Sequence, residues 1–527
     1  DPTILAQQIE SAMTDQEVLG QVLMFGYPTE GVDPNIIEWI RDEGLGGVKI
    51  FGWNANNLGI LAETVGRYQN TARTGRFGVP LLIATDQEGG WVRHVKGESS
   101  VTPGNMALGA DNLPYDAWMT GLLLGRELAA VGVNMNFAPT VDVFVDPKAD
   151  VIGPRAFMAD PQMTGIMGLS FARGHEEAGV ISTAKHFPGH GDTEQDSHGT
   201  LPRVTANLET LMARDLVPYR IMIAGGVPAI MTGHLAFPSI TGNEIPATLS
   251  EALLTDLLRD ELGFEGVAVT DDLFMRGART DGAPLHEVCY RSLRAGADIL
   301  LVSQGEDDFR SIHSRLITEM TDDVEFNKRV REAARRVLKM KAAWLKRPDG
   351  VPLNPDPDAV VVPSDGAPEF FLEQAARSIT LVNDTRFPVS PQNAGDVLLA
   401  GSYNEFFTEG LLRYPDARTW RLEYEDTRAG LERRGRELLR AARRYDTVIV
   451  LLPDEEISIL LDELEPIAEK VVVISVLSPA HLNSVQWAQT SLAAYGTGRD
   501  SFRAVFAALA GDYTPRGRLP IPLDTVQ

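Results

Sequence analysis

The sequence lacks several features that would place it in a specialised class of proteins. Cys289 is the one cysteine among 527 residues, which excludes an internal disulfide and any metal site built from clustered cysteines. No apolar run approaches the ~18 residues that a membrane-spanning helix needs. We therefore expect a soluble globular protein without a membrane span, in agreement with its 44% hydrophobic content.

Positive charge is also scarce. The chain has 48 Lys and Arg against 73 Asp and Glu, a formal net charge of -25. Such a chain repels phosphate backbones at long range, so nucleic acid is not an expected partner. Because the sequence begins at Asp1 rather than Met, both a cytoplasmic location and export with a removed signal segment stay open. The sequence does not indicate an oligomeric state.

The length predicts two domains, because single cores stop growing at ~250 to 300 residues. In the first 305 residues, eight short apolar runs alternate with stretches of helical spacing. The runs are 22–27, 47–53, 80–85, 133–138, 180–184, 229–232, 266–270 and 299–303. This alternation predicts an α/β fold with parallel strands, and eight units favour a (β/α)8 barrel of the TIM type. A doubly wound open sheet is the alternative.

A second domain is expected after a proline-rich linker. Residues 326–345 have the spacing of a basic amphipathic helix that ends the first domain, and prolines recur from 348 to 368. We predict a catalytic barrel over residues 1–346, a linker over 347–369 and an α/β/α sandwich over 370–527. The expected strands of the second domain are 378–382, 397–400, 447–452, 471–476 and 492–495.

Polar residues follow the ends of the predicted barrel strands. They are Asp86 and Glu88, Asp142, the segment 185–198, His234, and Asp271 with Asp272. Active sites of (β/α)8 barrels gather at the carboxyl ends of the strands. The sequence therefore predicts one active site built from these positions.

The segment 185–202 holds three histidines, two aspartates, a glutamate and a lysine among Pro and Gly breaks. In an extended loop we expect Asp196 and His198 to point to the same side, where a carboxylate tunes an imidazole for proton transfer. An alternative is that His198 only braces the loop. A metal-dependent hydrolase is a further alternative, because His186, His190, Asp192, Asp196 and His198 include suitable Zn or Mn ligands.

Asp271 and Asp272 follow the run 266–270. A carboxylate at the end of a barrel strand can attack an anomeric carbon or stabilise an oxocarbenium ion. The alternative is that it caps the following helix, a common role of Asp directly after a strand. The two residues allow both roles to be filled. The spacing alone does not choose between them.

These residues resemble the bacterial β-N-acetylglucosaminidases of glycoside hydrolase family 3. The family motif is Lys-His-Phe-Pro-Gly-His-Gly-Asp-Thr-x-x-Asp-Ser-His-x-x-Leu-Pro, and the chain matches every fixed position from Lys185 to Pro202. Further similar segments are 85–90, 136–142, 151–157 and 270–275, and 495–498 and 517–520 resemble the second domain of the family. The resemblance covers nearly the whole chain.

The resemblance implies a role for each site residue. Asp271 is the expected nucleophile, and Asp196 with His198 the general acid/base dyad. Asp86, Arg155, Lys185 and His186 match positions that hold the sugar hydroxyls. His190 and Asp192 carry no implied chemical step, and we expect them to brace the loop.

The implied reaction is a retaining, exo-acting release of terminal β-linked GlcNAc, without metal or organic cofactor. The expected carbohydrate substrates are GlcNAc-MurNAc fragments of peptidoglycan, with chitooligosaccharides as the second choice. Phosphorolysis, in which inorganic phosphate replaces water, stays an alternative. Another is a catalytically silent sugar-binding protein on the same barrel.

Overall fold

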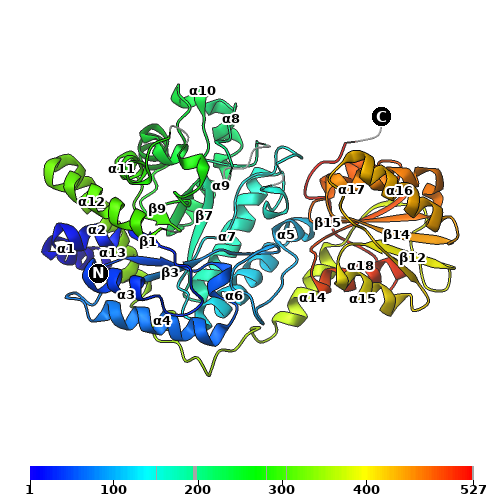
Figure 1. Cartoon of the computed structure of the whole chain (residues 1–527), viewed down its shortest axis with the longest axis horizontal. Helices are drawn as coiled ribbons and strands as arrows, with labels where there is room; N and C mark the ends of the chain where they lie inside the picture. The colour runs from blue at the N-terminus through cyan, green and yellow to red at the C-terminus, as the bar shows by residue number, and fades with distance from the viewer. Residues whose placement is uncertain (150, 194–198, 280–281, 304, 525–527) are drawn as a thin grey trace.

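The chain folds into a barrel and a separate α/β sandwich that lie side by side (Figure 1). The computed structural model describes residues 1–149, 151–193, 199–279, 282–303 and 305–524. Asp196 and His198 thus lie outside the described residues. In the described ranges, no helix has the length and apolar character to cross a membrane.

Eight parallel strands form the barrel, as the apolar runs predicted. They are β1 (Leu23–Phe25), β2 (Gly47–Lys49), β3 (Leu82–Thr85), β6 (Met135–Asn136), β7 (Ile181–Phe187), β8 (Ala229–Thr232), β9 (Val267–Thr270) and β10 (Leu300–Val302). Their order is β10-β1-β2-β3-β6-β7-β8-β9. A parallel bridge between Val269 and Ile299 joins β9 to β10, so the sheet nearly closes on itself. The predicted (β/α)8 architecture is confirmed.

Helices surround the barrel. They are α1 (Pro2–Ala12), α2 (Asp15–Gln21), α3 (Pro34–Asp42), η1 (Gly52–Asn54), α4 (Leu58–Arg73), α5 (Asn105–Asp111), α6 (Pro114–Ala130), η2 (Gly153–Arg155), α7 (Pro161–Glu177), α8 (Leu208–Ala213), α9 (Leu216–Ala224), α10 (Pro238–Thr241), η3 (Ala247–Leu249), the π-helix η4 (Ala252–Glu261), η5 (Arg276–Ala278), α11 (Leu285–Ala295), α12 (Glu306–Asp322) and α13 (Val324–Trp344); a hairpin of β4 (Gln87–Gly89) and β5 (Val92–Arg93) follows β3. Asp33 and Asp160 show how the sequence starts such helices. Each caps the first turn with its carboxylate, and the proline after it fits the first helical position.

Successive side chains of the barrel strands alternate between a core inside the barrel and a core between the strands and the surrounding helices. Met24, Met135 and Ile181 point into the barrel, where Val337 and Met340 of α13 pack against them. The predicted amphipathic helix at 326–345 is therefore α13, whose Lys341 donates to Gln21 and Gly46 at the amino ends of β1 and β2. The active-site residues accordingly lie at the other, carboxyl end of the strands.

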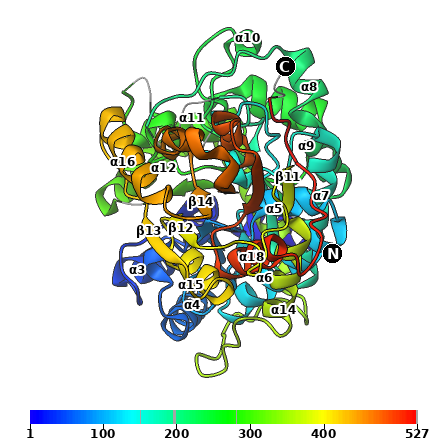
Figure 2. The same cartoon turned by 90° about the vertical axis from the view of Figure 1, so that its right-hand side faces the viewer.

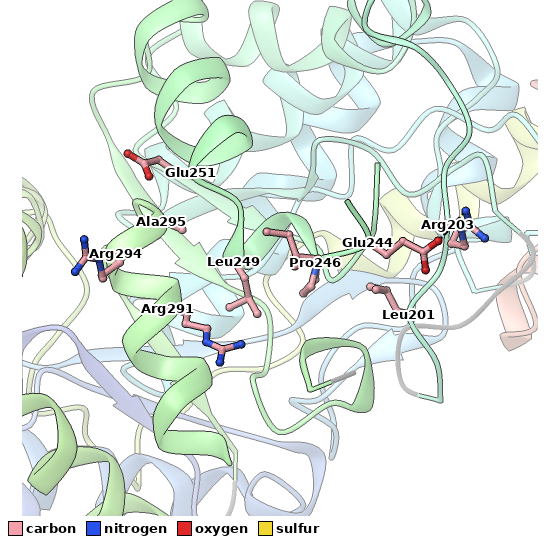
Figure 3. A pocket seen from close by; sticks show the side chains of 10 residues that line it. Leu201, Arg203, Glu244, Pro246, Leu249, Glu251, Arg291, Arg294 and Ala295 are labelled. Atoms are coloured by element: carbon pink, nitrogen blue, oxygen red, sulfur yellow. Dashed lines mark ion pairs between the residues drawn. The ribbon is translucent and has the colours of Figure 1, made fainter. Parts of the chain in front are cut away.

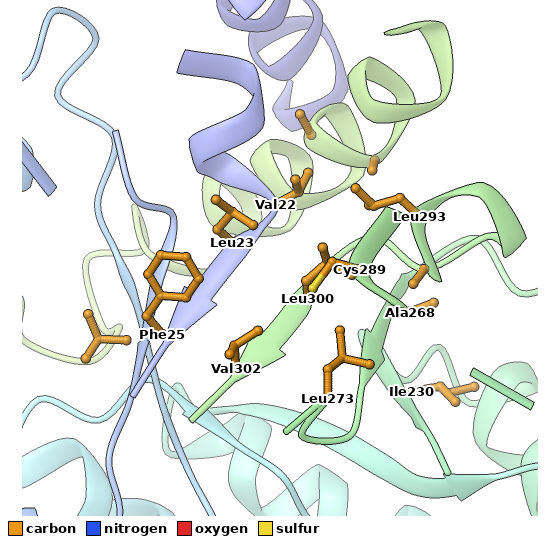
Figure 4. Packing of buried hydrophobic residues seen from close by; sticks show 14 of the residues in the cluster. Val22, Leu23, Phe25, Ile230, Ala268, Leu273, Cys289, Leu293, Leu300 and Val302 are labelled. Atoms are coloured by element: carbon orange, nitrogen blue, oxygen red, sulfur yellow. The ribbon is translucent and has the colours of Figure 1, made fainter. Parts of the chain in front are cut away.

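The outer core lies between the strands and the helices. Phe25, Leu300 and Val302 belong to it, together with Cys289 and Leu293 of α11 (Figure 4). Cys289 is fully buried, and burial raises the pKa of its thiol above the ordinary value. A buried neutral thiol of this kind acts as a small hydrophobic residue.

The second unit is a three-layer sandwich, as predicted. Its sheet has the order β11-β16-β15-β14-β12-β13, in which only β11 is antiparallel to its neighbour among the described strands. The strands are β11 (Thr380–Asp384), β12 (Val397–Gly401), β13 (Arg418–Arg421), β14 (Thr447–Leu452), β15 (Val471–Val476) and β16 (Thr490–Tyr495). The helices are α14 (Ala367–Ser378), α15 (Asn404–Arg413), α16 (Arg428–Ala442), α17 (Glu455–Leu461), η6 (Asp462–Lys470), η7 (Pro479–Val485) and α18 (Arg499–Ala510).

Helices cover both faces of this sheet (Figure 2). Phe406 of α15 and Phe502 of α18 pack on one face, and Leu431 of α16 and Ile457 of α17 pack on the other. The strand β13 was not among the predicted strands. Its residues Arg-Thr-Trp-Arg form an edge strand with mostly exposed side chains, so no apolar run marks it.

The two units share a small apolar interface near α5. Met106, Ile152 and Tyr495 belong to one buried cluster that spans both units. Backbone hydrogen bonds from Arg518 to Ala110 and from Ala159 to Pro520, both 2.9 Å long, tie the C-terminal segment to the barrel unit. The bounds 1–346, 347–369 and 370–527 stay predictions.

Glu127 of α6 holds the segment between the units. It is 1% exposed, and its carboxylate accepts hydrogen bonds from the backbone N–H of Ser100 (2.9 Å) and of Ser364 (3.0 Å). The hydroxyl of Ser364 donates to the carbonyl of Leu123 at 3.1 Å. One buried carboxylate therefore fixes a barrel loop and the predicted linker at the same time.

We predict that Glu127→Ala lowers the free energy of unfolding by about 2 to 4 kcal/mol, because two buried N–H groups lose their acceptor. Urea unfolding followed by circular dichroism measures the change. Glu325→Ala is the control, since its pair with Lys328 is exposed and is worth about 0.5 kcal/mol or less. Equal effects of the two substitutions would contradict the role of Glu127.

Candidate active site

A cavity of about 710 Å³ opens at the carboxyl ends of the barrel strands. The residues that line it come from several strands and the loops after them: Lys49, Asp86, Glu88, Arg155, Lys185, His186, His190, Asp271 and Asp272 are among them. The structure thus brings together Asp86, Arg155, Lys185, His186 and Asp271, which the sequence analysis had selected from distant segments. Their roles stay predictions.

Five charged side chains form an ion cluster at the floor of the cavity. Asp86 accepts from Lys185 Nζ with Oδ1 and from Lys49 Nζ with Oδ2, each at 2.6 Å. Glu88 Oε1 also accepts from Lys185 at 2.6 Å. Arg155 donates to both oxygens of Glu88, at 2.9 Å from Nε and 2.7 Å from Nη2. Each charge in this floor cluster therefore touches at least one opposite charge.

Burial and ion pairing shift the pKa values of the floor cluster in opposite directions. Burial raises the pKa of Asp86, but Lys185 and Lys49 outweigh it and hold that pKa well below its usual range. Burial likewise opposes ionisation of Glu88, but Arg155 and Lys185 lower its pKa to about 2. The pKa of Lys185 is raised, since Asp86 and Glu88 outweigh its burial. Asp86, Glu88 and Lys185 are therefore charged at neutral pH.

Asp86 and Arg155 are the members of the floor cluster that reach the cavity surface. Their side chains are 18% and 12% exposed, whereas those of Lys49, Glu88 and Lys185 are exposed by 2% or less. A carboxylate and a guanidinium beside each other offer acceptors and donors to vicinal hydroxyls. Lys185 therefore holds Asp86 and Glu88 in place, and its expected contact with the sugar stays a prediction.

His186 is held in one orientation by two charged neighbours. Its Nδ1 lies 2.7 Å from Asp142 Oδ2, and its Nε2 lies 3.1 Å from Arg155 Nη2. Arginine only donates, so Nε2 accepts and the ring proton is assigned to Nδ1, which donates to Asp142. The backbone N–H of His186 also donates to Asp142, at 3.2 Å.

The two aspartates after β9 differ in their surroundings. Asp272 Oδ1 accepts from the backbone N–H groups of Phe274 (3.0 Å) and Ser303 (3.1 Å), so its side chain organises the loop. Asp271 Oδ1 accepts from the N–H of Asp272 at 2.7 Å. Burial raises the pKa of Asp271, but His234 and His186 outweigh it and keep that pKa below the ordinary value. Asp271 is thus ionised at neutral pH, and its side chain accepts fewer of these backbone hydrogen bonds than that of Asp272.

His190 and Asp192 were expected to brace the loop after β7. Asp192 Oδ2 pairs with Arg214 at 2.6 Å, which agrees with that expectation. The backbone N–H of His190 donates to Asp142 at 2.7 Å, whereas neither of its ring nitrogens has a partner among the described residues. Gly191 lies so close to the Val143 carbonyl that no Cβ fits.

The predicted dyad, Asp196 and His198, lies outside the described residues, so its assignment rests on the sequence motif. The metal-dependent alternative draws on the same segment. Among the described residues, no group of three or more His, Cys, Asp and Glu side chains is arranged to hold a metal ion. His186 and Asp192, two of the proposed ligands, are engaged with Asp142 and Arg214 instead.

Lys49 and Trp53 line the cavity and were not among the predicted site residues. Lys49 ends the apolar run of β2, and its ammonium lies 4.7 Å from the centre of the Phe51 ring. A lysine within an apolar strand indicates a functional or ion-paired position, because a buried charge needs a partner of opposite charge. Trp53 carries no such signal.

A second cavity, of about 650 Å³, lies beside α11 (Figure 3). Arg203 pairs there with Glu244 at 2.9 Å, and Arg291 and Glu251 lie farther along it. None of the described residues that line it belongs to the cavity at the strand ends.

Comparisons with known proteins show the family of the chain. Residues 14–340 match the model of the glycosyl hydrolase family 3 N-terminal domain. The solved structure of a family 3 β-N-acetylglucosaminidase from Paenibacillus sp. str. FPU-7 has a TM-score of 0.87 at 29% identity, and the match covers 97% of this chain and 99% of that one.

Two curated relatives are also similar. A β-N-acetylglucosaminidase/β-glucosidase of Cellulomonas fimi is 29% identical, over 97% of this chain and 94% of the relative. β-Hexosaminidase A of Pseudoalteromonas piscicida is 33% identical, over 62% of this chain, and the match spans 61% of that relative. The chain therefore belongs to glycoside hydrolase family 3 and is a glycoside hydrolase.

Proposed function

We propose that the protein is a retaining exo-β-N-acetylglucosaminidase that releases terminal β-linked GlcNAc from GlcNAc-MurNAc fragments or chitooligosaccharides. The names of its relatives, β-N-acetylglucosaminidase and β-hexosaminidase, support GlcNAc as the released sugar. The observation that carries the proposal is that Asp271, an ionised carboxylate at the end of β9, shares one cavity with Asp86 and Arg155. A nucleophile and a set of hydroxyl-binding groups thus lie together.

The first half of the reaction forms a glycosyl-enzyme. Asp271 attacks the anomeric carbon, the bond from that carbon to the leaving oxygen breaks, and His198 donates a proton to that oxygen. An ester of Asp271 results. The low pKa of Asp271 keeps it ionised and thus nucleophilic at neutral pH. Assignment of His198, with Asp196 to orient it, follows from the motif.

The second half releases the sugar. Neutral His198 takes a proton from water, the water oxygen attacks the anomeric carbon from the face that the leaving group vacated, and the Asp271 carboxylate departs. Two inversions give net retention. An imidazole suits both steps, because its reference pKa of ~6.5 lies near neutrality.

The floor cluster positions the sugar during both steps. Asp86 accepts from hydroxyl groups and Arg155 donates to them, and neither moves freely, since each is held by an ion pair. Fixed charges of this kind need no reorganisation as the reaction proceeds, so the sugar keeps one orientation through both steps.

Asp271→Ala should lower turnover at least ~10³-fold while it leaves binding of GlcNAc within severalfold, because the nucleophile is lost and the floor cluster is not. Steady-state kinetics on chitobiose and calorimetry with GlcNAc measure the two quantities. Asp256→Ala, at an exposed position of η4, is the control. Unchanged turnover of the Asp271 variant would remove the residue from its role, and a silent wild type would favour the sugar-binding alternative.

Water is expected to be the acceptor in the second step. Chitobiose is incubated with the enzyme in buffer with and without inorganic phosphate, and the products are separated by anion exchange. The main product is GlcNAc in both cases. Formation of GlcNAc-1-phosphate at the expense of GlcNAc would make phosphorolysis the main activity.

Removal of metal ions tests the alternative that the protein is a metal-dependent hydrolase. Activity on chitobiose after dialysis against EDTA should equal the activity before, since the proposed mechanism uses an ester and proton transfers alone. Loss of activity that added Zn or Mn restores would replace this mechanism by a metal-dependent one.

A further inference from the structure

A groove of about 460 Å³ adjoins the active-site cavity at the carboxyl ends of β1 and β10. Residues after β1, the first turn of α3 and the start of α12 line it. The groove and the active-site cavity share two lining residues, Trp53 and Ser303. The two spaces are therefore neighbours across these side chains.

Trp53 presents a fixed aromatic face at this junction. Its ring stacks on Phe51 with centroids 4.6 Å apart and planes 6° from parallel. Its Nε1–H donates to the carbonyl of Tyr27 at 2.9 Å, and the side chain is 44% exposed. Tryptophan is suited to a surface that is apolar on one side and wet on the other. The C–H face of a pyranose ring matches such a surface.

The groove has an apolar wall and an unused polar group. Ile36 and Phe309 line it and are buried. Tyr27 lines it as well, is 2% exposed, and its hydroxyl has no hydrogen-bond partner among the described residues. A buried hydroxyl without a partner costs about 1 to 3 kcal/mol, so it needs a compensating reason. A ligand hydroxyl or amide that reached this buried oxygen would supply the missing hydrogen bond, so the residue probes occupation of the groove.

The charges of the groove select against acids. Its charged lining residues, within the described ranges, are the carboxylates Asp33 and Glu306, with no Lys, Arg or His. Glu306 pairs with Arg310 at 2.9 Å on the exposed side of α12, and Asp33 is 5% exposed. A carboxylate on the ligand would lie next to Asp33 without a cation to offset its desolvation.

The active-site cavity differs in this respect. Arg276 and Arg279 line it on the loop after β9, and no ion pair with a carboxylate is found for either among the described residues. An acidic leaving group would find its cations there and not in the groove. The active-site cavity thus offers cations to the leaving group, whereas the groove offers carboxylates.

We infer that the groove between Tyr27, Trp53 and Phe309 is the leaving-group subsite, and that it takes uncharged sugar units. The inference rests on the proposed function. It narrows the substrate to neutral β-linked GlcNAc oligomers, whose second and third units lie on Trp53 and in the groove. GlcNAc-MurNAc, with its lactyl carboxylate, is the poorer substrate.

The first test removes one hydroxyl from the groove. Tyr27→Phe keeps the ring and should lower the ratio of kcat/KM for chitotriose to kcat/KM for 4-nitrophenyl N-acetyl-β-glucosaminide about 5- to 10-fold, the effect of one hydrogen bond. Tyr219→Phe is the matched control, because Tyr219 is also a buried tyrosine whose hydroxyl has no partner among the described residues, and it does not line the groove. Its ratio should equal that of the wild type.

The second test addresses charge. Wild-type kcat/KM for chitobiose should exceed that for GlcNAc-MurNAc at least about tenfold, and Glu306→Lys should narrow the difference, since a cation then lies at the rim of the groove. A wild-type preference for GlcNAc-MurNAc that Arg276→Gln with Arg279→Gln abolishes would overturn the inference and place the leaving group beside those arginines.

The outcomes separate the inference from the proposed function. If the wild type releases no GlcNAc from any of these substrates, the proposed function fails. If it releases GlcNAc but Tyr27→Phe leaves the ratio unchanged while the variant keeps the wild-type melting temperature, the subsite assignment fails. A Tyr27→Phe variant that melts early is replaced by Asn35→Trp, which fills the groove mouth and should lower the same ratio.

Discussion

The mutual compensation of buried charges in the floor cluster is the constraint on which the rest of the site depends. Moving one such ion out of water costs several kcal/mol, and only a close opposite charge offsets that cost. Lys49, Asp86, Glu88, Arg155 and Lys185 belong to four separate stretches of the chain, and each is held within 3 Å of an opposite charge. The floor cluster is therefore satisfied only when those stretches are all in place.

The same cluster sets the charge of the active site. Three basic and two acidic side chains meet in it, and burial lowers the pKa of one of the basic groups, Lys49. Asp271 benefits, because Lys185 contributes to its low pKa together with His234 and His186. In the proposed function the terminal sugar is held by these fixed charges, whereas the groove beside Trp53 offers an aromatic face and, among its described lining residues, carboxylates without a cation. In this proposal, ion-paired side chains bind the terminal sugar and an aromatic face binds the next sugar unit. Substitutions can therefore alter one of the two binding regions without altering the other.

Much of this arrangement could be predicted from the sequence, and the limits are physical. The eight barrel strands are short and buried, so apolar runs marked all of them, and strand ends located Asp86, Lys185 and Asp271. Asp271 and Asp272 could not be separated by spacing, because their difference lies in which backbone N–H groups reach each carboxylate. The groove escaped notice for a similar reason. Tyr27, Trp53 and Phe309 read as ordinary aromatic residues until the fold brings them together.

The edge strand β13 has a consequence for the behaviour of the protein in concentrated solution. An open sheet edge is a template on which a second chain can add a strand, and this is a route to aggregation. Arg418 and Arg421 stand at the two ends of β13, with mostly exposed side chains. Two copies that met edge to edge would bring four guanidinium groups together. The charged pattern that hid this strand in the sequence thus guards the sheet against unwanted self-association.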